Sequence, residues 1–173
     1  MTQANLVPSF IAAAYEAASN SNADYKAFLE AYRGALPTHP ELGDPALTER
    51  IVDTANRGNT PSVRQAAYRT LDVIAEARPD LLDNEMAVGV AMGAASGMQK
   101  DSCMVALNTA RVIVEHRPDF AKAMRTVAKE VAARTWPNWC QSLEKAIDKG
   151  LQNSRRPLAL SRVTESLLQL TAQ

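Results

Sequence analysis

Apolar residues in the central part of the chain recur at the spacing of an α-helix. Within residues 62–77, small and aliphatic side chains fall on one face, and charged or amide side chains fall on the opposite face. This pattern predicts an amphipathic helix with its apolar face in a core. Gly58 ends the preceding helix, Thr60 caps the new one, and Pro61 fits its first turn. The core positions of this helix are Val63, Ala67, Leu71 and Ile74.

The same helical pattern is present along most of the chain, and few segments resemble strands. Alanine runs such as "FIAAAYEAAS" and "EVAAR" add to this, because Ala is the best helix former. The sequence therefore predicts an all-α fold. The expected helices cover approximately residues 8–19, 23–36, 45–57, 62–77, 86–96, 102–116, 120–131, 137–152 and 157–171.

Two segments of the chain are nearly the same. Residues 67–80 read "AYRTLDVIAEARPD" and residues 106–119 read "ALNTARVIVEHRPD", with eight of fourteen positions identical. A self-similar period of 39 residues identifies an internal repeat. One domain, residues 1–173, then contains units at approximately 20–58, 59–98, 99–135 and 136–173. Four prolines share the register: Pro40, Pro79, Pro118 and Pro157.

The repeated "RPD" tag has a structural and a functional interpretation. A basic residue suits the end of a helix, Pro cannot continue that helix, and an acidic residue suits the start of the next. The four prolines then mark corners between the two helices of each unit. In the functional interpretation, the residues that precede the prolines form a column that holds an acidic partner. That column would contain His39, Arg78, Arg117 and Arg156.

Neither helix of a unit can bury its apolar stripe alone, so the units should stack. Stacking predicts a right-handed α-α superhelix, a solenoid of about four helix pairs, with an N-terminal capping helix at residues 8–19. The stretch "TPSVRQAAYRTL" resembles the first helix of HEAT-type repeats, in which a Val-Arg pair precedes "xAAxxAL". The third unit departs from this motif with "DSCMVALNTA". The resemblance implies a HEAT-like (HEAT/armadillo-type) protein, a class that mostly serves as scaffolds for other proteins.

Charge is balanced overall but divided between the two halves of the chain. The net charge is zero, so the whole protein is not an obvious nucleic-acid binder. Residues 1–86 contain seven Lys and Arg and twelve Asp and Glu, and residues 87–173 contain the reverse. The first half is therefore acidic and the second half basic.

The first candidate site is a face of small residues in the second unit. Gly89, Gly93 and Gly97 recur every four residues, although each Gly costs about 1 kcal/mol of helix propensity relative to Ala. Close packing of a neighbouring helix is the structural explanation. The functional one is a shallow trough for the helix of a partner, because Met surfaces adapt to varied ligands. That trough would be lined by Met86, Met92 and Met98.

The second candidate site is a basic stripe in the third unit. Lys122, Arg125 and Lys129 lie at i, i+3 and i+7, and thus on one helix face. A solvated face is the structural interpretation, and an anion-attracting surface for an acidic partner is the functional one. Trp136 is a candidate exposed anchor of an interface, whereas Trp139 is expected in the core.

Catalytic and cofactor motifs are not found in the sequence. Cys103 and Cys140 favour a reducing compartment over a disulfide framework. No clustered metal ligands, phosphate loop or dinucleotide motif is present, so we expect neither a metal nor another cofactor. The most apolar run, residues 86–98, is too short to span a bilayer. The sequence therefore predicts a cytoplasmic protein that is neither an enzyme nor a membrane protein.

Three functions remain open at this point. The first is a non-enzymatic scaffold that binds a protein, acidic in the case of the basic stripe, through the second helices of its units. The second is nucleic-acid binding, because some DNA-repair glycosylases resemble this fold and use a basic concave face. The neutral total charge and the acidic first half oppose that second function. The third is a homo-oligomer joined by contact of the acidic and basic halves.

Overall fold

The protein is described here from a computed structural model, which describes residues 12–14, 16–17, 20–96, 100–132 and 137–170. Side chains are described in these ranges apart from those of Lys100, Pro137 and residues 156–170. The fold is all-α, and no strand occurs in the described ranges. The α-helices are α2 (Asn22–Ala35), α3 (Pro45–Arg57), α4 (Pro61–Ala77), α5 (Asn84–Ala95), α6 (Lys100–His116), α7 (Ala121–Ala132) and α8 (Pro137–Leu170). Short 3-10 helices, η2 (Pro40–Leu42), η3 (Pro79–Leu81) and η4 (Pro118–Phe120), join α2 to α3, α4 to α5 and α6 to α7.

Side-chain caps fix where three of these helices begin. The carboxylate of Asp44 accepts a hydrogen bond from the Leu47 backbone N–H at 2.8 Å, at the start of α3. Thr60 and Asp83 cap α4 and α5 in the same way. Each cap satisfies a backbone N–H that has no partner within its own helix. The cap at Thr60 agrees with the sequence prediction.

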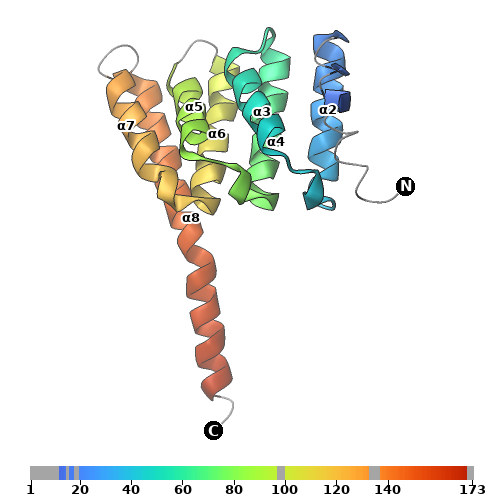
Figure 1. Ribbon diagram of the computed structural model, residues 1–173. Helices are drawn as coiled ribbons and strands as arrows, with labels where there is room; N and C mark the ends of the chain where they lie inside the picture. Colours follow the sequence, from blue (N-terminus) through green and yellow to red (C-terminus); the bar gives the residue numbers. More distant parts are fainter. Residues whose placement is uncertain (1–11, 15, 18–19, 97–99, 133–136, 171–173) are drawn as a thin grey trace.

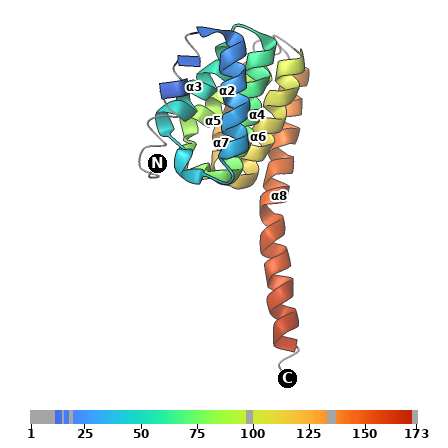
Figure 2. The same cartoon turned by 90° about the vertical axis from the view of Figure 1, so that its right-hand side faces the viewer.

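The helices form two layers that follow the sequence from one end of the body to the other (Figures 1 and 2). In one layer, α2 packs against α4, α4 against α6, and α6 against α8. In the other layer, α3 packs against α5, and α5 against α7. The layers are joined because α3, α5 and α7 pack against α4, α6 and α8 respectively. The second helix of each unit thus packs on the first helix of the next unit.

The core between these layers consists of aliphatic residues and alanine. Leu29, Ile51, Leu71, Ile113 and Leu143 are fully buried, and they come from five different helices. The four core positions predicted for residues 62–77 are all buried. Burying a side chain of this size contributes about 1.5–3 kcal/mol relative to leaving it exposed. The helix faces that pack between units are therefore the main source of stability.

Two buried threonines at equivalent repeat positions add polar contacts between units. The hydroxyl of Thr70 in α4 lies 3.4 Å from the carbonyl oxygen of Leu29 in α2 and 2.9 Å from that of Ala66 one turn earlier, so its one proton is shared between the two units. Thr109 of α6, 39 residues later, donates to the carbonyl oxygen of Tyr68 in α4, at 3.1 Å. Both threonines are fully buried. This explains why Thr is retained at an otherwise apolar position of the repeat.

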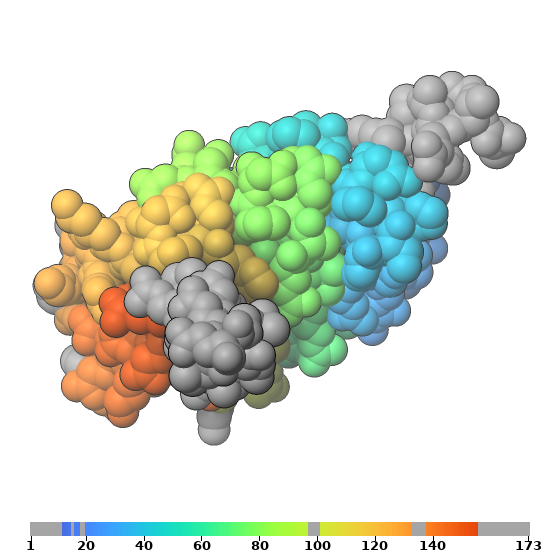
Figure 3. Space-filling view, turned by 90° about the horizontal axis from the view of Figure 1, so that it is seen from below, coloured from blue at the N-terminus to red at the C-terminus, as the bar shows by residue number. Residues whose placement is uncertain are grey.

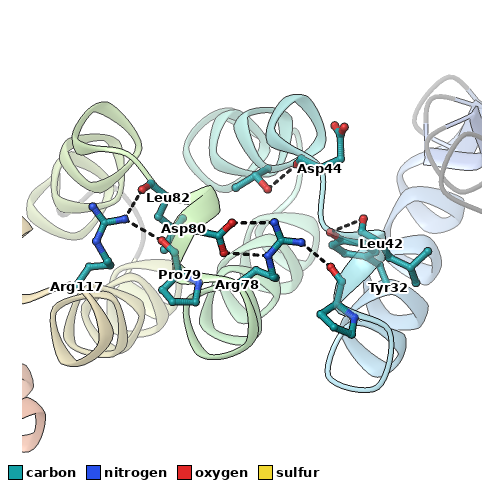
Figure 4. Close-up of polar contacts among 10 residues, drawn as sticks. Tyr32, Leu42, Asp44, Arg78, Pro79, Asp80, Leu82 and Arg117 are labelled. Atoms are coloured by element: carbon teal, nitrogen blue, oxygen red, sulfur yellow. Dashed lines mark hydrogen bonds and ion pairs between the residues drawn. The ribbon is translucent and has the colours of Figure 1, made fainter.

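An arginine side chain joins the first two corners. The guanidinium group of Arg78 donates two hydrogen bonds to the carboxylate of Asp80, at 2.9 and 2.8 Å. Its third donor reaches the carbonyl oxygen of Pro40, in the corner of the preceding unit, at 2.7 Å (Figure 4). Bidentate pairing of this kind fixes the guanidinium geometry. Arg78 thus binds its own corner and the preceding one with a single group.

Arg117 repeats this arrangement one unit later. It donates two hydrogen bonds to Asp119, at 3.1 and 2.9 Å, and one each to the carbonyl oxygens of Pro79 and Leu82, both at 2.9 Å. Its guanidinium carbon lies 4.1 Å from the ring centroid of Phe120, a cation–π contact. We call Arg78 and Arg117, with the groups that they bind, the arginine ladder. Figure 3 shows the end of the body where successive corners lie side by side.

The first corner carries a weaker version of the same pair. His39 Nδ1 lies 3.1 Å from a carboxylate oxygen of Glu41, and both side chains are largely exposed. The column of His39, Arg78 and Arg117 is therefore engaged within the chain. The side chain of Arg156 lies outside the described side chains.

The fourth unit differs from the prediction. Helix α8 is a single helix of 34 residues, so neither the expected corner at Pro157 nor the division into helices at 137–152 and 157–171 is found (Figure 1). The residue after Pro157 explains why the corner is absent. Position 158 is Leu, whereas the equivalent positions in the ladder are Asp80 and Asp119. Without that carboxylate, the fork that holds Arg in the non-helical corner conformation cannot form.

The N-terminal capping helix, predicted at residues 8–19, falls mostly outside the described residues. Residues 12–14 and 16–17 are helical, and Ala14 is fully buried against the core. These residues are compatible with a helix that covers the first unit.

Replacing Arg117 with Met should lower the free energy of unfolding by about 2 kcal/mol. The carboxylate of Asp119 and the carbonyl oxygens of Pro79 and Leu82 would lose their charged hydrogen-bond donor. Urea denaturation followed by circular dichroism measures this change. Arg69→Met is the matched control, because Arg69 is exposed on α4, and we expect a change within about 0.5 kcal/mol. Equal effects of R117M and R69M would show that the ladder does not stabilise the fold.

Stability should also depend on pH through the ladder carboxylates. The hydrogen bonds from Arg117 lower the pKa of Asp119 below its ordinary value, and Arg78 does the same to Asp80. A lowered folded-state pKa stabilises the fold above the unfolded-state pKa of about 4, and this contribution is lost as the pH falls through the folded-state value. The free energy of unfolding should therefore decrease on acidification below about pH 4.

The variant Asp119→Asn should show a shallower decrease over the same pH range, measured by urea denaturation at a series of pH values. Glu130→Gln is the control, since Glu130 is exposed on α7 and outside the ladder. A decrease in D119N as steep as in the unmodified protein would contradict the role of the fork.

Candidate interaction surface

A groove of about 510 Å³ lies between α3 and α5, the second helices of the first two units. Val52, Met86 and Gly89, which are buried or half-buried, form its floor. Four exposed carboxylates line its sides: Glu49, Asp53, Asp83 and Glu85. We call this feature the acidic groove. Its apolar floor and charged sides resemble the apolar centre and polar rim of protein interfaces.

Local structure explains where the carboxylates are. Glu49 and Asp53 are one turn apart on α3 and so share a face of that helix. Asp83 caps α5, and Glu85 lies in its first turn, where the positive end of the helix dipole favours an acidic residue. Asp53 also pairs with Arg57 at 3.3 Å, although both side chains remain largely exposed.

Two of the predicted glycines are explained by packing within the chain. A Cβ atom at Gly89 would lie 3.2 Å from both Val52 and Asn56 of α3. A Cβ atom at Gly93 would overlap the hydroxyl of Tyr68 and lie 2.5 Å from Asn56 Oδ1. The hydrogen bond from Tyr68 to Asn56, at 2.8 Å, occupies the space that Gly93 leaves.

Two of the three methionines of the predicted trough lie in the described residues. Met86 lies in the acidic groove, and Met92 is 51% exposed on α5. Gly97 and Met98 lie outside the described residues. Met86 and Gly89 thus line the acidic groove, whereas Gly93 borders a separate cavity, and the binding role of these residues stays a prediction.

The basic stripe lines a different groove, of about 430 Å³, between α7 and α8. Lys122 and Lys129 are exposed, while Arg125 is half-buried and pairs with Asp148 of α8 at 2.5 Å. The structure therefore separates the candidate residues into two grooves of opposite charge. We call this second one the basic groove.

The remaining candidates add little to either groove. Trp136 lies outside the described residues, and Trp139 packs partly buried against the core, as predicted. Cys103 and Cys140 are buried free thiols, and burial raises the pKa of Cys140. Among the described residues, no group of His, Cys, Asp or Glu is arranged to hold a metal ion. Within the same part of the chain, no helix is long and apolar enough to cross a membrane.

The sequence prediction missed the acidic groove. Its carboxylates form two pairs that are about thirty residues apart in the chain, so no local motif links them. The available signal was the excess of Asp and Glu in residues 1–86 together with the i, i+4 spacing of Glu49 and Asp53.

The substitution Gly93→Ala should destabilise the protein, although Ala favours helices by about 1 kcal/mol. Overpacking against Tyr68 and Asn56 costs about 1–3 kcal/mol and outweighs that gain. Gly34→Ala is the matched control: nothing lies within 4 Å of its added Cβ on α2, so we expect stabilisation of about 0.5–1 kcal/mol. Thermal and urea denaturation measure both changes, and stabilisation by G93A would contradict the packing explanation.

Comparison with known proteins found no matching family model, no matching curated protein and no matching solved structure. The resemblance to HEAT-type repeats therefore rests on residues 60–71 and on the 39-residue period. The all-helical, pairwise-packed fold is compatible with that resemblance.

Proposed function

We propose that this chain is a HEAT-like repeat protein, a right-handed superhelix of helix pairs, that acts as a non-enzymatic protein-binding scaffold. Its acidic groove receives a basic segment of a partner protein. The observation that carries this proposal is the combination of an apolar floor and four exposed carboxylates between α3 and α5. The floor supplies contact area, and the carboxylates favour a Lys- or Arg-rich segment over an acidic one.

The acidic groove is favoured over the basic groove because its charge is less compensated. Of its four carboxylates, Asp53 alone has an ion pair within the described residues, with the exposed Arg57, which also lines the groove. The lining therefore carries four negative charges and one positive charge. In the basic groove, the central residue Arg125 is paired with Asp148, and Asp119 also lines the groove. The net attraction for a charged partner is therefore greater at the acidic groove.

The double variant Glu49→Lys/Glu85→Lys tests this function. Both residues are exposed, and neither is the capping Asp83 or the paired Asp53, so the fold should be retained. The control is Glu30→Lys/Glu76→Lys, which makes the same charge change on exposed residues of α2 and α4. Affinity capture from an extract of the native cells, with mass spectrometry, identifies proteins that the unmodified chain and the control retain.

Binding of the captured partner should weaken at least tenfold in E49K/E85K, equivalent to about 1.4 kcal/mol, in calorimetric titrations. The control should bind as the unmodified chain does. Affinity should also fall with added salt, because exposed charges are screened. If both double variants retain the same proteins with the same affinity, the acidic groove is not the binding surface.

The basic groove supports a second candidate function, which is binding of an acidic protein segment. Lys122, Arg125 and Lys129 line it together with Leu151, which adds an apolar contact. Charge reversal of the three basic residues to Glu should abolish that binding and leave the binding of a basic segment at the acidic groove unchanged. A gel shift with DNA and RNA at low salt distinguishes this function from nucleic-acid binding, for which we expect no shift at micromolar protein.

A further inference from the structure

A small cavity of about 80 Å³ lies where four helices meet, apart from both grooves. It is bordered by the C-terminal ends of α3 and α5 and by the N-terminal turns of α4 and α6. Its lining combines apolar and polar groups, and the polar ones include Asn56, Arg64 and Ser102. The positive ends of the α4 and α6 dipoles and the negative ends of the α3 and α5 dipoles thus border one cavity, so the preference for an anion comes from the side chains of the lining.

The acceptors in the lining are already used by donors of the lining itself. The carbonyl oxygen of Gly93 accepts hydrogen bonds from the Ser96 hydroxyl at 3.0 Å and from the Cys103 thiol at 3.7 Å. Asn56 Oδ1 accepts one from the Tyr68 hydroxyl at 2.8 Å. Burial raises the pKa of Tyr68, so this hydroxyl stays protonated and remains a donor.

One buried polar group of the lining is left without a partner, and it is a hydroxyl that can donate to a ligand. The hydroxyl of Ser102, in the first turn of α6, has no hydrogen-bond partner although the residue is only 7% exposed. A buried polar group without a hydrogen-bond partner costs about 1–3 kcal/mol. A ligand that fills the cavity should therefore supply acceptors.

The charged side chain in the described lining of the cavity is basic, which also favours a ligand with acceptor atoms. Arg64 lines it and is held in place by a hydrogen bond to the Gly58 carbonyl oxygen. No Asp or Glu is among the described residues that line the cavity, and Asp101 of α6 is exposed outside it. A guanidinium group and the N-terminal turn of a helix together form the usual environment of a bound oxyanion.

We propose that this cavity binds a small oxyanion, with the Ser102 hydroxyl and Arg64 as its principal donors. The volume corresponds to two or three water molecules at about 30 Å³ each, which suits a phosphate-sized group and excludes a whole nucleotide. The anion would satisfy the buried Ser102 hydroxyl and join the starts of α4 and α6. It would thereby stabilise the junction between the second and third units.

The proposal is tested with inorganic phosphate as the probe, at constant ionic strength set by chloride. Phosphate should raise the melting temperature of the full chain saturably, because it binds the folded state. Ser102→Ala removes the unpartnered hydroxyl and should weaken phosphate binding at least tenfold in calorimetric titrations. Ser142→Ala is the matched control, because Ser142 lies on α8 away from the cavity and should leave binding unchanged.

Backbone amide signals of Ser102 and Cys103 should shift on phosphate addition in nuclear magnetic resonance spectra. This readout does not depend on the stability of any variant. The same titrations with sulfate and with phosphoserine distinguish two kinds of ligand. Binding of sulfate supports a free oxyanion, whereas stronger binding of phosphoserine supports a phosphoryl group carried by a larger molecule.

Three results would overturn the proposal. They are equal phosphate affinity in S102A and S142A, amide shifts confined to residues remote from the cavity, and the absence of any saturable effect, which would mean that the cavity holds water alone. The outcome is independent of the acidic groove, because E49K/E85K should bind phosphate as the unmodified chain does.

Discussion

The stack depends on how the arginine ladder connects one unit to the next. Each arginine donates two hydrogen bonds to the aspartate of its own corner and binds the preceding corner through its third nitrogen, Nη1. The position of one unit is thereby linked to the local conformation of its neighbour. The buried threonines of α4 and α6 repeat this linkage inside the core, so corners and core are joined with the same 39-residue register.

The packing of the layers follows from this linkage. Because α3, α5 and α7 pack on the first helix of the following unit and on one another, the core lies between units. Stability therefore belongs to the contacts between units more than to any unit in isolation. The acidic groove arises where this packing leaves space between α3 and α5, and the basic groove where it leaves space between α7 and α8. Their opposite charges follow from the acidic and basic halves of the chain.

Local signals in the sequence were sufficient to predict most helices and their starts. Thr60 and Pro61 mark the start of α4 because capping depends on neighbouring residues alone. The fourth unit was predicted incorrectly because the proline register was extended to Pro157 although Leu158 replaces the carboxylate. The acidic groove and the polar cavity depend on side chains from separate helices. Space such as that which Gly93 leaves for Tyr68 is set by tertiary packing, which the sequence pattern does not encode.

The reach of the contacts between units has a consequence for folding kinetics. In the described residues, the hydrogen bonds from the ladder arginines and the buried threonines to the preceding unit span 35 to 41 positions of the chain. Closing each of these contacts requires a loop of about one unit, and the entropic cost of a loop rises with its length. Because each of these contacts joins neighbouring units, we expect folding to start at an adjacent pair of units and to extend outward one unit at a time, with one unit-length loop closed at each step.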